Sequence, residues 1–243
     1  MKEYDLIIVG SGLFGATVAY CAKEKGLQCL MLERRSVCSG NVYDEPADGF
    51  YVSKYGAHIF HTDNERVWNF IRQFADFNDY THRVLVESKG NKYHIPVCAV
   101  TFNEIFGTET VSEMDVMLRK EHSIESYANP KNLEEMAINR VGRKAYELLI
   151  KGYTEKQWGR QASELPKKII ERLPVRMNYD TRYFSDRFQG MPLCGYTELV
   201  KRMIKDTEVL YGVDFNASKE YWINKAETIV YTGMIDELMD FKY

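Results

Sequence analysis

The stretch from Asp5 to Glu33 constrains the fold of this chain more than any other. A short apolar run, Tyr4 to Val9, has the length of a buried strand, and the glycine-rich segment Gly10 to Gly15 follows it directly. A helical run from Ala16 to Lys25 comes next, and Cys29 to Glu33 is typical of a second strand. This order of elements is that of a dinucleotide-binding βαβ unit. We therefore expect an α/β fold that begins with a Rossmann-like domain.

The glycines and the acid of this unit each have an expected role. Gly10 permits a tight turn, Gly12 lets the backbone approach a pyrophosphate at the amides of the helix N-terminus, and Gly15 lets helix and strand pack closely. Glu33 ends the second strand, where an acid can hydrogen-bond a ribose hydroxyl and disfavours a ribose that carries a 2′-phosphate. The alternative is a glycine-rich turn that binds no ligand.

Composition excludes several other classes of protein. The 243 residues carry a formal net charge of -3, so no basic field suggests nucleic acid. No apolar run is long enough for a signal peptide or a membrane span, so we expect no membrane span. An odd number of cysteines without a CxxC pair favours reduced thiols in the cytoplasm over disulfides or structural zinc. The cysteines are Cys21, Cys29, Cys38, Cys98 and Cys194.

Two loops after the second strand contain candidate site residues. The arginines Arg34 and Arg35 begin a polar loop that continues to Tyr43, and they could counter a diphosphate, although a solvated basic loop is an equal alternative. His58 and His61 are spaced as i and i+3, but they precede the helix that we expect from Asn64 to Ala75 and have no third ligand nearby. We expect no metal here, and we favour a position beside the cofactor for His58.

The middle of the chain does not continue the βαβ pattern of the first 33 residues. Thr81 to Glu87 and Lys92 to Ile95 predict a β-hairpin, and helical patterns then dominate as far as Lys151. Further on, arginines alternate with tyrosines between Arg172 and Arg187, a pattern that suits an anionic, ring-bearing ligand. A solvated basic face with tyrosines in the core is the alternative. Strands at 208–211 and 228–231 are expected to return to the first sheet.

At this point the chain resembles UDP-galactopyranose mutase, a flavoenzyme family. The resemblance is carried by colinear segments along the whole chain, which are more specific than any single motif. They are Ile8 to Ala16, Lys54 to Thr62, Asn132 to Glu135, Ile150 to Arg160, Pro174 to Arg176, Tyr183 to Asp186, Gln189-Gly190 and Tyr231 to Gly233.

The resemblance implies FAD, needed in its reduced form, in the Rossmann-like site. It implies an enzyme, an intramolecular transferase that interconverts UDP-galactopyranose and UDP-galactofuranose for cell-surface polysaccharide biosynthesis. In this chemistry N5 of reduced FAD attacks the anomeric carbon of galactose as UDP leaves. It also implies a cytoplasmic protein without nucleic-acid partners, for which a homodimer is one expected assembly.

The resemblance assigns residues by position. His58 and Arg172 are the expected catalytic residues, His58 beside the isoalloxazine and Arg172 on a loop that closes over the diphosphate. The expected cofactor-binding residues are Gly10, Ser11, Gly12, Phe14, Gly15, Glu33, Arg34, Gly40, Asn41, His58, Ile59, Val213 and Asp214. The expected substrate-binding residues are His82, Tyr153, Thr154, Trp158, Arg172 and Tyr183, and no metal is expected.

The resemblance also predicts the domain organisation. Residues 1–80 and 190–243 would form a discontinuous FAD-binding Rossmann-like domain. Residues 98–172 would form a helical substrate and gating domain, and residues 81–97 and 173–189 would form part of a mixed substrate-binding sheet. The chain corresponds to the first two thirds of the family's length, so we expect a C-terminally truncated chain that lacks a second diphosphate arginine.

Three residues depart from the family pattern. Ser39 precedes Gly40-Asn41 where the family has a second glycine, His82 stands where an asparagine is common, and Leu149 stands where some members carry phenylalanine. Two rival functions remain open. One is a non-catalytic remnant that binds a flavin or a nucleotide sugar, and the other is a flavin oxidoreductase of the amine-oxidase type.

Overall fold

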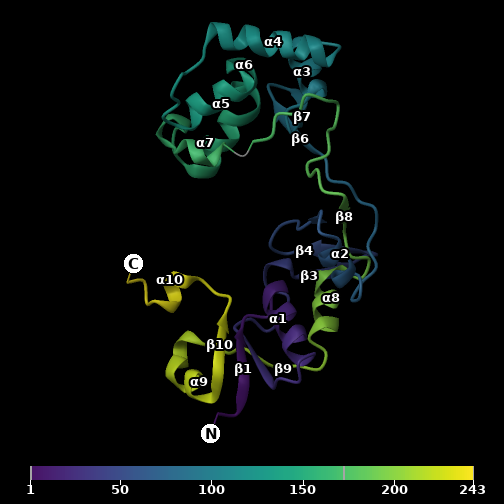
Figure 1. Ribbon diagram of the computed structural model, residues 1–243, viewed down its shortest axis with the longest axis vertical. Helices are drawn as coiled ribbons and strands as arrows, with labels where there is room; N and C mark the ends of the chain where they lie inside the picture. Colours follow the sequence, from purple (N-terminus) through teal and green to yellow (C-terminus); the bar gives the residue numbers. More distant parts are fainter. Residues whose placement is uncertain (1, 172, 243) are drawn as a thin grey trace. The chain divides into compact units, whose positions relative to one another are not determined.

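The computed structural model describes residues 2–171 and 173–242, which divide into two compact units (Figure 1). Unit 1 consists of Met1–Tyr80 and Asp186–Tyr243, and unit 2 consists of Thr81–Ser185. Unit 2 is therefore inserted into unit 1, and the chain passes between them twice. The finer division into a cofactor domain, a helical domain and part of a substrate sheet stays a prediction.

A parallel four-stranded sheet forms the centre of unit 1. Its strand order is β10 (Ala226–Tyr231), β1 (Tyr4–Val9), β2 (Cys29–Glu33) and β9 (Glu208–Tyr211). All three neighbouring pairs are parallel, and Val9 pairs with both Leu32 and Tyr231. The prediction of an α/β fold with a Rossmann-like domain is confirmed, including the return of the two late strands to the first sheet.

Helices cover both faces of this sheet. Ile8 and Met31 are fully buried on one face, where α1 (Leu13–Lys23), α2 (Glu65–Ile71) and α8 (Gly195–Met203) contribute to the same core. Ile7 and Leu30 are buried on the other face, in a core that α9 (Lys219–Lys225) shares through Trp222. Burial on both faces explains why the strands are continuous apolar runs and not alternating ones.

Two small antiparallel sheets complete unit 1, together with α10 (Ile235–Leu238). β3 (Asp44–Ala47) pairs with β4 (Phe50–Ser53), and β5 (Phe60–Thr62) pairs with β8 (Phe188–Gly190). Asp44 is buried, and its carboxylate accepts hydrogen bonds from the amides of Tyr196 and Thr197 at 2.7 and 2.9 Å. This carboxylate therefore caps the N-terminus of α8 from a strand about 150 residues earlier in the chain.

Unit 2 has its own core, formed by the fully buried Phe102, Met114, Ile138 and Tyr146. Its elements are, in order, β6 (Val84–Ser88), β7 (Asn91–Ile95), α3 (Ala99–Phe106), α4 (Val111–Ile124), α5 (Leu133–Val141), α6 (Arg143–Tyr146), a π-helical turn (Glu147–Lys151) and α7 (Gly152–Trp158). The predicted hairpin and helical block are both present. Short 3-10 turns at Ala162–Glu164 and Lys167–Ile169 follow α7.

Several helix starts differ from the sequence prediction. The helix α1 begins at Leu13 and not at Ala16, because the backbone turns into helix directly after Gly12. The helix α2 begins at Glu65 and not at Asn64, whose side chain accepts hydrogen bonds from the amides of its first turn. The side chain of Thr110 caps α4. Among the described residues, no helix is long and apolar enough to cross a bilayer.

Candidate dinucleotide site

A cavity of about 530 Å³ lies in unit 1 at the carboxyl ends of the parallel strands. This is the edge at which open parallel sheets bind their ligands. All of the predicted cofactor residues except Ser11, His58 and Ile59 line the cavity. Those that do are Gly10, Gly12, Phe14, Gly15, Glu33, Arg34, Gly40, Asn41, Val213 and Asp214. The structure thus brings together residues from three separate parts of the sequence, and their roles stay predictions.

The glycines form a cradle that side chains would fill. A β-carbon at Gly15 would lie 2.0 Å from the carbonyl oxygen of Gly10, so α1 can approach β1 only without one. A β-carbon at Gly40 would lie 3.1 Å from Cα of Gly12, with which the loop after β2 is in contact. No side chain caps the N-terminus of α1 at Gly12. The amides of its first turn are therefore suited to a diphosphate.

Glu33 is held rigidly at the floor of the site. It is 6% exposed, and one carboxylate oxygen accepts hydrogen bonds from the amide and the hydroxyl of Ser11 at 2.9 and 2.6 Å. The other oxygen accepts from the amide of Arg35 at 2.9 Å. A carboxylate has about four acceptor positions, so capacity remains for a ribose hydroxyl. Ser11 itself is fully buried, and the structure places it as a support for Glu33.

The two arginines after β2 have different surroundings. Arg34 is exposed and forms an ion pair with Glu237 at 3.1 Å, and both residues line the cavity. The Arg35 guanidinium lies 4.2 Å from the centre of the Tyr55 ring and donates to Asn41 at 3.1 Å, while its buried Nη1 has no partner among the described residues. Arg35 therefore has a buried donor that a ligand could satisfy, although the family pattern favours Arg34.

His58 and Ile59 lie on the loop that precedes β5 and do not line the cavity. Nδ1 of His58 is 3.0 Å from the carbonyl oxygen of Gly56, within the same loop. Their predicted position beside the isoalloxazine stays a prediction.

The predicted substrate residues that the structure describes belong to unit 2. His82 and Tyr183 are distant in sequence but in contact, with ring centroids 5.6 Å apart and a hydrogen bond of 2.8 Å from the Tyr183 amide to the His82 carbonyl. Tyr153 and Trp158 are exposed on α7, whereas Thr154 is only 7% exposed. Arg172 lies outside the described residues.

Sequence reasoning missed other residues that line the cavity. Asn216 comes from the segment after β9, and Tyr231, Thr232 and Met234 come from the end of β10. Thr232 is anchored to β1 by hydrogen bonds from its amide and its hydroxyl to the carbonyl of Val9, at 3.0 and 2.7 Å. The signal that could have identified these residues is their place directly after predicted parallel strands.

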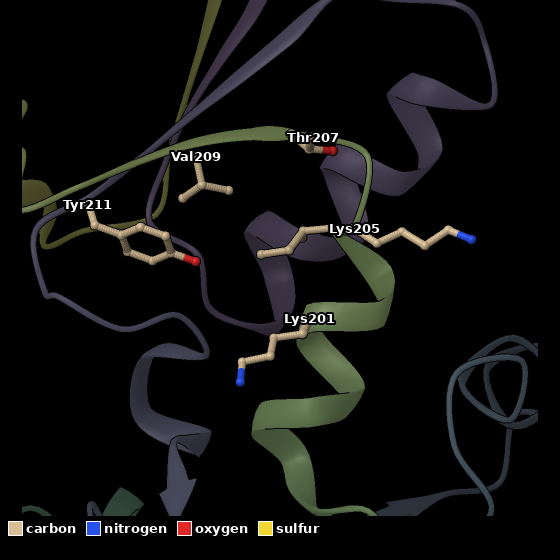
Figure 2. Close-up of a pocket in the computed structure, with 6 residues that line it drawn as sticks. Lys201, Lys205, Thr207, Val209 and Tyr211 are labelled. Carbon is tan, nitrogen blue, oxygen red and sulfur yellow. The ribbon is translucent and has the colours of Figure 1, made fainter.

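Figure 2 shows a second pocket of unit 1, of about 330 Å³, between the end of α8 and the strand β9. Lys201, Lys205, Thr207 and Tyr211 line it, and none of the predicted site residues does. Partial burial and the neighbouring Cys38 thiol raise the pKa of Tyr211 to about 12, so the phenol stays protonated at neutral pH.

Comparisons with known proteins find similar sequences along the chain. A family model described as UDP-galactopyranose mutase matches residues 148–243, and one described as an NAD(P)-binding Rossmann-like domain matches residues 8–74. A Klebsiella pneumoniae protein named "Probable UDP-galactopyranose mutase" is 36% identical over 100% of this chain and 64% of its own length. The dTDP-fucopyranose mutase of Escherichia coli is 35% identical over 98% of this chain and 65% of its own length.

A solved structure has a similar fold. A crystal structure of reduced UDP-galactopyranose mutase aligns with 98% of this chain and 57% of that chain, at a TM-score of 0.70 and 14% identity. The present chain thus spans less than two thirds of the length of these relatives.

Proposed function

We propose that this chain, which is related to the UDP-galactopyranose mutases along its whole length, binds FAD in the cavity of unit 1 and acts on UDP-galactopyranose and UDP-galactofuranose. One observation carries the proposal. Most of the cofactor residues predicted from the family, all except Ser11, His58 and Ile59, line a single cavity at the carboxyl edge of a parallel sheet. A dinucleotide of this kind needs such an edge, with a helix N-terminus and an acid beside it.

The residues of unit 1 fit the adenosine and diphosphate part of FAD. The amides that follow Gly12 would hold the diphosphate, and Glu33 would accept a hydrogen bond from the adenosine ribose. Nη1 of Arg35 is a buried donor with no partner in the described part of the chain, and an anionic ligand would satisfy it. Phe14 is 67% exposed at the cavity and would be covered by the ligand. Reduced FAD, when bound, supplies a nucleophilic nitrogen for the anomeric carbon.

Unit 2 would bind the uridine diphosphate part of the substrate. The exposed rings of Tyr153 and Trp158 are suited to stack on a base, and Tyr183 with His82 offers a second group of ring and hydroxyl donors. Thr154 is buried, so it would act by positioning α7. The assignment of Arg172 to the diphosphate rests on the sequence resemblance.

A second sugar nucleotide remains a candidate. The relative named dTDP-fucopyranose mutase is nearly as similar as the relative named UDP-galactopyranose mutase, at 35% against 36% identity.

The five free cysteines support a cytoplasmic location for the chain. The expected homodimer can be tested separately, by sedimentation of the purified chain.

The decisive experiment measures flavin binding first and substrate turnover second. The purified chain is incubated with FAD, and bound flavin is measured by absorbance after gel filtration. Dithionite is then added with UDP-galactofuranose or dTDP-fucofuranose, and the pyranose products are quantified by chromatography. Folded protein that retains no flavin would exclude every candidate function that requires a bound flavin. Flavin retention without turnover would favour the non-catalytic remnant, and peroxide formed from an amine would favour the oxidoreductase.

A pair of variants tests the position of the cofactor. Glu33→Ala is expected to lower FAD retention about tenfold, because a buried acceptor for the ribose is lost. Asp206→Ala removes the same charge from a surface ion pair with Lys23 and should leave retention unchanged. Equal retention in both variants would remove Glu33 from the site.

A further inference from the structure

The adenine end of the cavity can be located from the elements that surround it, given the FAD site proposed above. The diphosphate belongs at Gly12 and the ribose at Glu33, so the base must lie beyond Glu33, past the ends of β2 and β9. The segment 213–216 and the residues from Tyr231 onwards at the end of β10 line the same cavity as Glu33. They are the candidates for contact with the base.

Two side chains at this end form a hydrogen-bonded pair with unused capacity. Asn216 Nδ2 donates to the Tyr231 hydroxyl oxygen at 3.0 Å, and both residues line the cavity. The buried Oδ1 of Asn216 has no donor among the described residues. Because the Tyr231 oxygen accepts from Asn216, its own hydrogen is left to donate, and no acceptor for it exists in the described part of the chain.

The surroundings fix this pair in place. The amide of Asn216 donates to Asp214 at 2.9 Å, and the Tyr231 ring lies 5.8 Å from that of Phe215. A β-carbon at Gly233 would lie 2.5 Å from the Tyr231 hydroxyl, so this glycine leaves the space that the hydroxyl occupies.

The neighbouring groups are already engaged. The amide of Val213 donates to the carbonyl of Glu33 at 3.0 Å, so it is not free to bind a base. The Arg34 guanidinium is paired with Glu237. An acceptor on Asn216 and a donor on Tyr231, both without a partner in the described part of the chain, are thus adjacent at the cavity.

We propose that Asn216 and Tyr231 determine the specificity of this site for adenine. The exocyclic amine of adenine would donate to Asn216 Oδ1, and the Tyr231 hydroxyl would donate to the ring nitrogen N1. Hypoxanthine presents a carbonyl and an N–H at the same two positions, so both contacts would be mismatched. A site built to hydrogen-bond one pattern rejects the other because its buried groups are left unpaired.

The test compares two nucleotides that differ only at this edge of the base. ADP and IDP share the ribose and the diphosphate, and their affinities for the purified chain are measured by isothermal titration calorimetry. We expect ADP to bind about 10- to 100-fold more tightly than IDP. Tyr231→Phe and Asn216→Leu should each lower the affinity for ADP about tenfold and change the affinity for IDP little. The ratio of the two affinities should therefore fall.

Two controls separate base recognition from damage to the site. Tyr211→Phe removes a hydroxyl from the neighbouring strand β9, in the pocket of Figure 2, and should keep the full preference for ADP. Glu33→Gln should lower the affinities for ADP and for IDP by the same factor, because the substitution alters only the contact with the ribose. Circular dichroism confirms that each variant is folded.

Equal affinity of the wild-type chain for ADP and IDP would overturn the inference, as would an unchanged ratio in both Tyr231→Phe and Asn216→Leu. Neither result would affect the FAD proposal, which is tested by flavin retention. Failure of the folded chain to bind FAD, ADP and IDP would overturn both.

Discussion

Ser39 has an unusual backbone conformation for its residue type. Its φ is 84°, in the left-handed region that favours glycine, and the residue is fully buried. It stands where the mutase pattern has a second glycine, and it nevertheless forms a β-bridge with Gly12. The cost is therefore backbone strain, not a lost contact.

Ser39→Gly is expected to stabilise the chain by about 0.5–1 kcal/mol. Relief of the left-handed strain exceeds the extra conformational entropy that glycine brings to the unfolded state. Urea denaturation at equilibrium measures the change. The neighbouring Gly40→Ala is the control, because its β-carbon would lie 3.1 Å from Cα of Gly12 at a φ of +56°, and it should destabilise. A loss of stability in Ser39→Gly would show that its side chain contributes more than the strain costs.

At the scale of the elements, one arginine joins the helices of unit 2. Arg143 begins α6 and forms ion pairs with Glu125 at the end of α4, with Glu134 of α5 at 3.3 Å, and with Glu147 at 3.6 Å. Hydrogen bonds from Arg143 and from the Tyr127 hydroxyl hold the pKa of Glu125 at about 2. The network orients three helices that precede α7, which carries the predicted substrate residues.

This network makes a prediction for the dependence of stability on pH. The pKa of Glu125 is lowered in the folded state, so its stabilisation is complete above about pH 4.5 and is lost as the pH falls towards 2. Glu125→Gln should therefore be less stable than wild type by about 1–2 kcal/mol at pH 7, a value reduced for partial exposure. The difference should shrink on acidification, as thermal unfolding from pH 7 to pH 3 would show. A difference that is constant over this range would contradict the assignment.

At the scale of the whole molecule, the chain is built from two units with separate cores. The cavity and its predicted cofactor residues belong to unit 1, and the predicted substrate residues that the structure describes belong to unit 2. A ligand that binds only the cavity should stabilise only the unit that contains it.

ADP is therefore expected to raise one of two thermal transitions. At 100 times its dissociation constant, a ligand adds about 2.7 kcal/mol to the stability of the unit that binds it. Trp68 and Trp222 lie in unit 1 and Trp158 in unit 2, so fluorescence of Trp158→Phe reports on unit 1 alone. Its transition should shift with ADP, while the transition of Trp158 in unit 2, followed in a variant that lacks Trp68 and Trp222, should not. A single transition that shifts as a whole would show that the units unfold together.

Local sequence determined much of the fold and part of the site. The segment from Asp5 to Glu33 predicts a dinucleotide-binding unit. Its strand, glycine turn, helix and terminal acid can each be predicted because they depend on residues that are close together in the sequence. Short elements escaped prediction, since three-residue strands such as β5 and β8 have no periodicity of their own and exist only through pairing with each other.

The sequence by itself therefore determined the α/β class, the two late strands and the glycine cradle, because these depend on short-range patterns. Only the tertiary structure decided that Asp44 caps α8, that Arg34 pairs with Glu237, and that Asn216 and Tyr231 meet at the end of the cavity. These contacts join residues far apart in sequence, or on separate elements, and their distances are set by how the sheet and its helices pack.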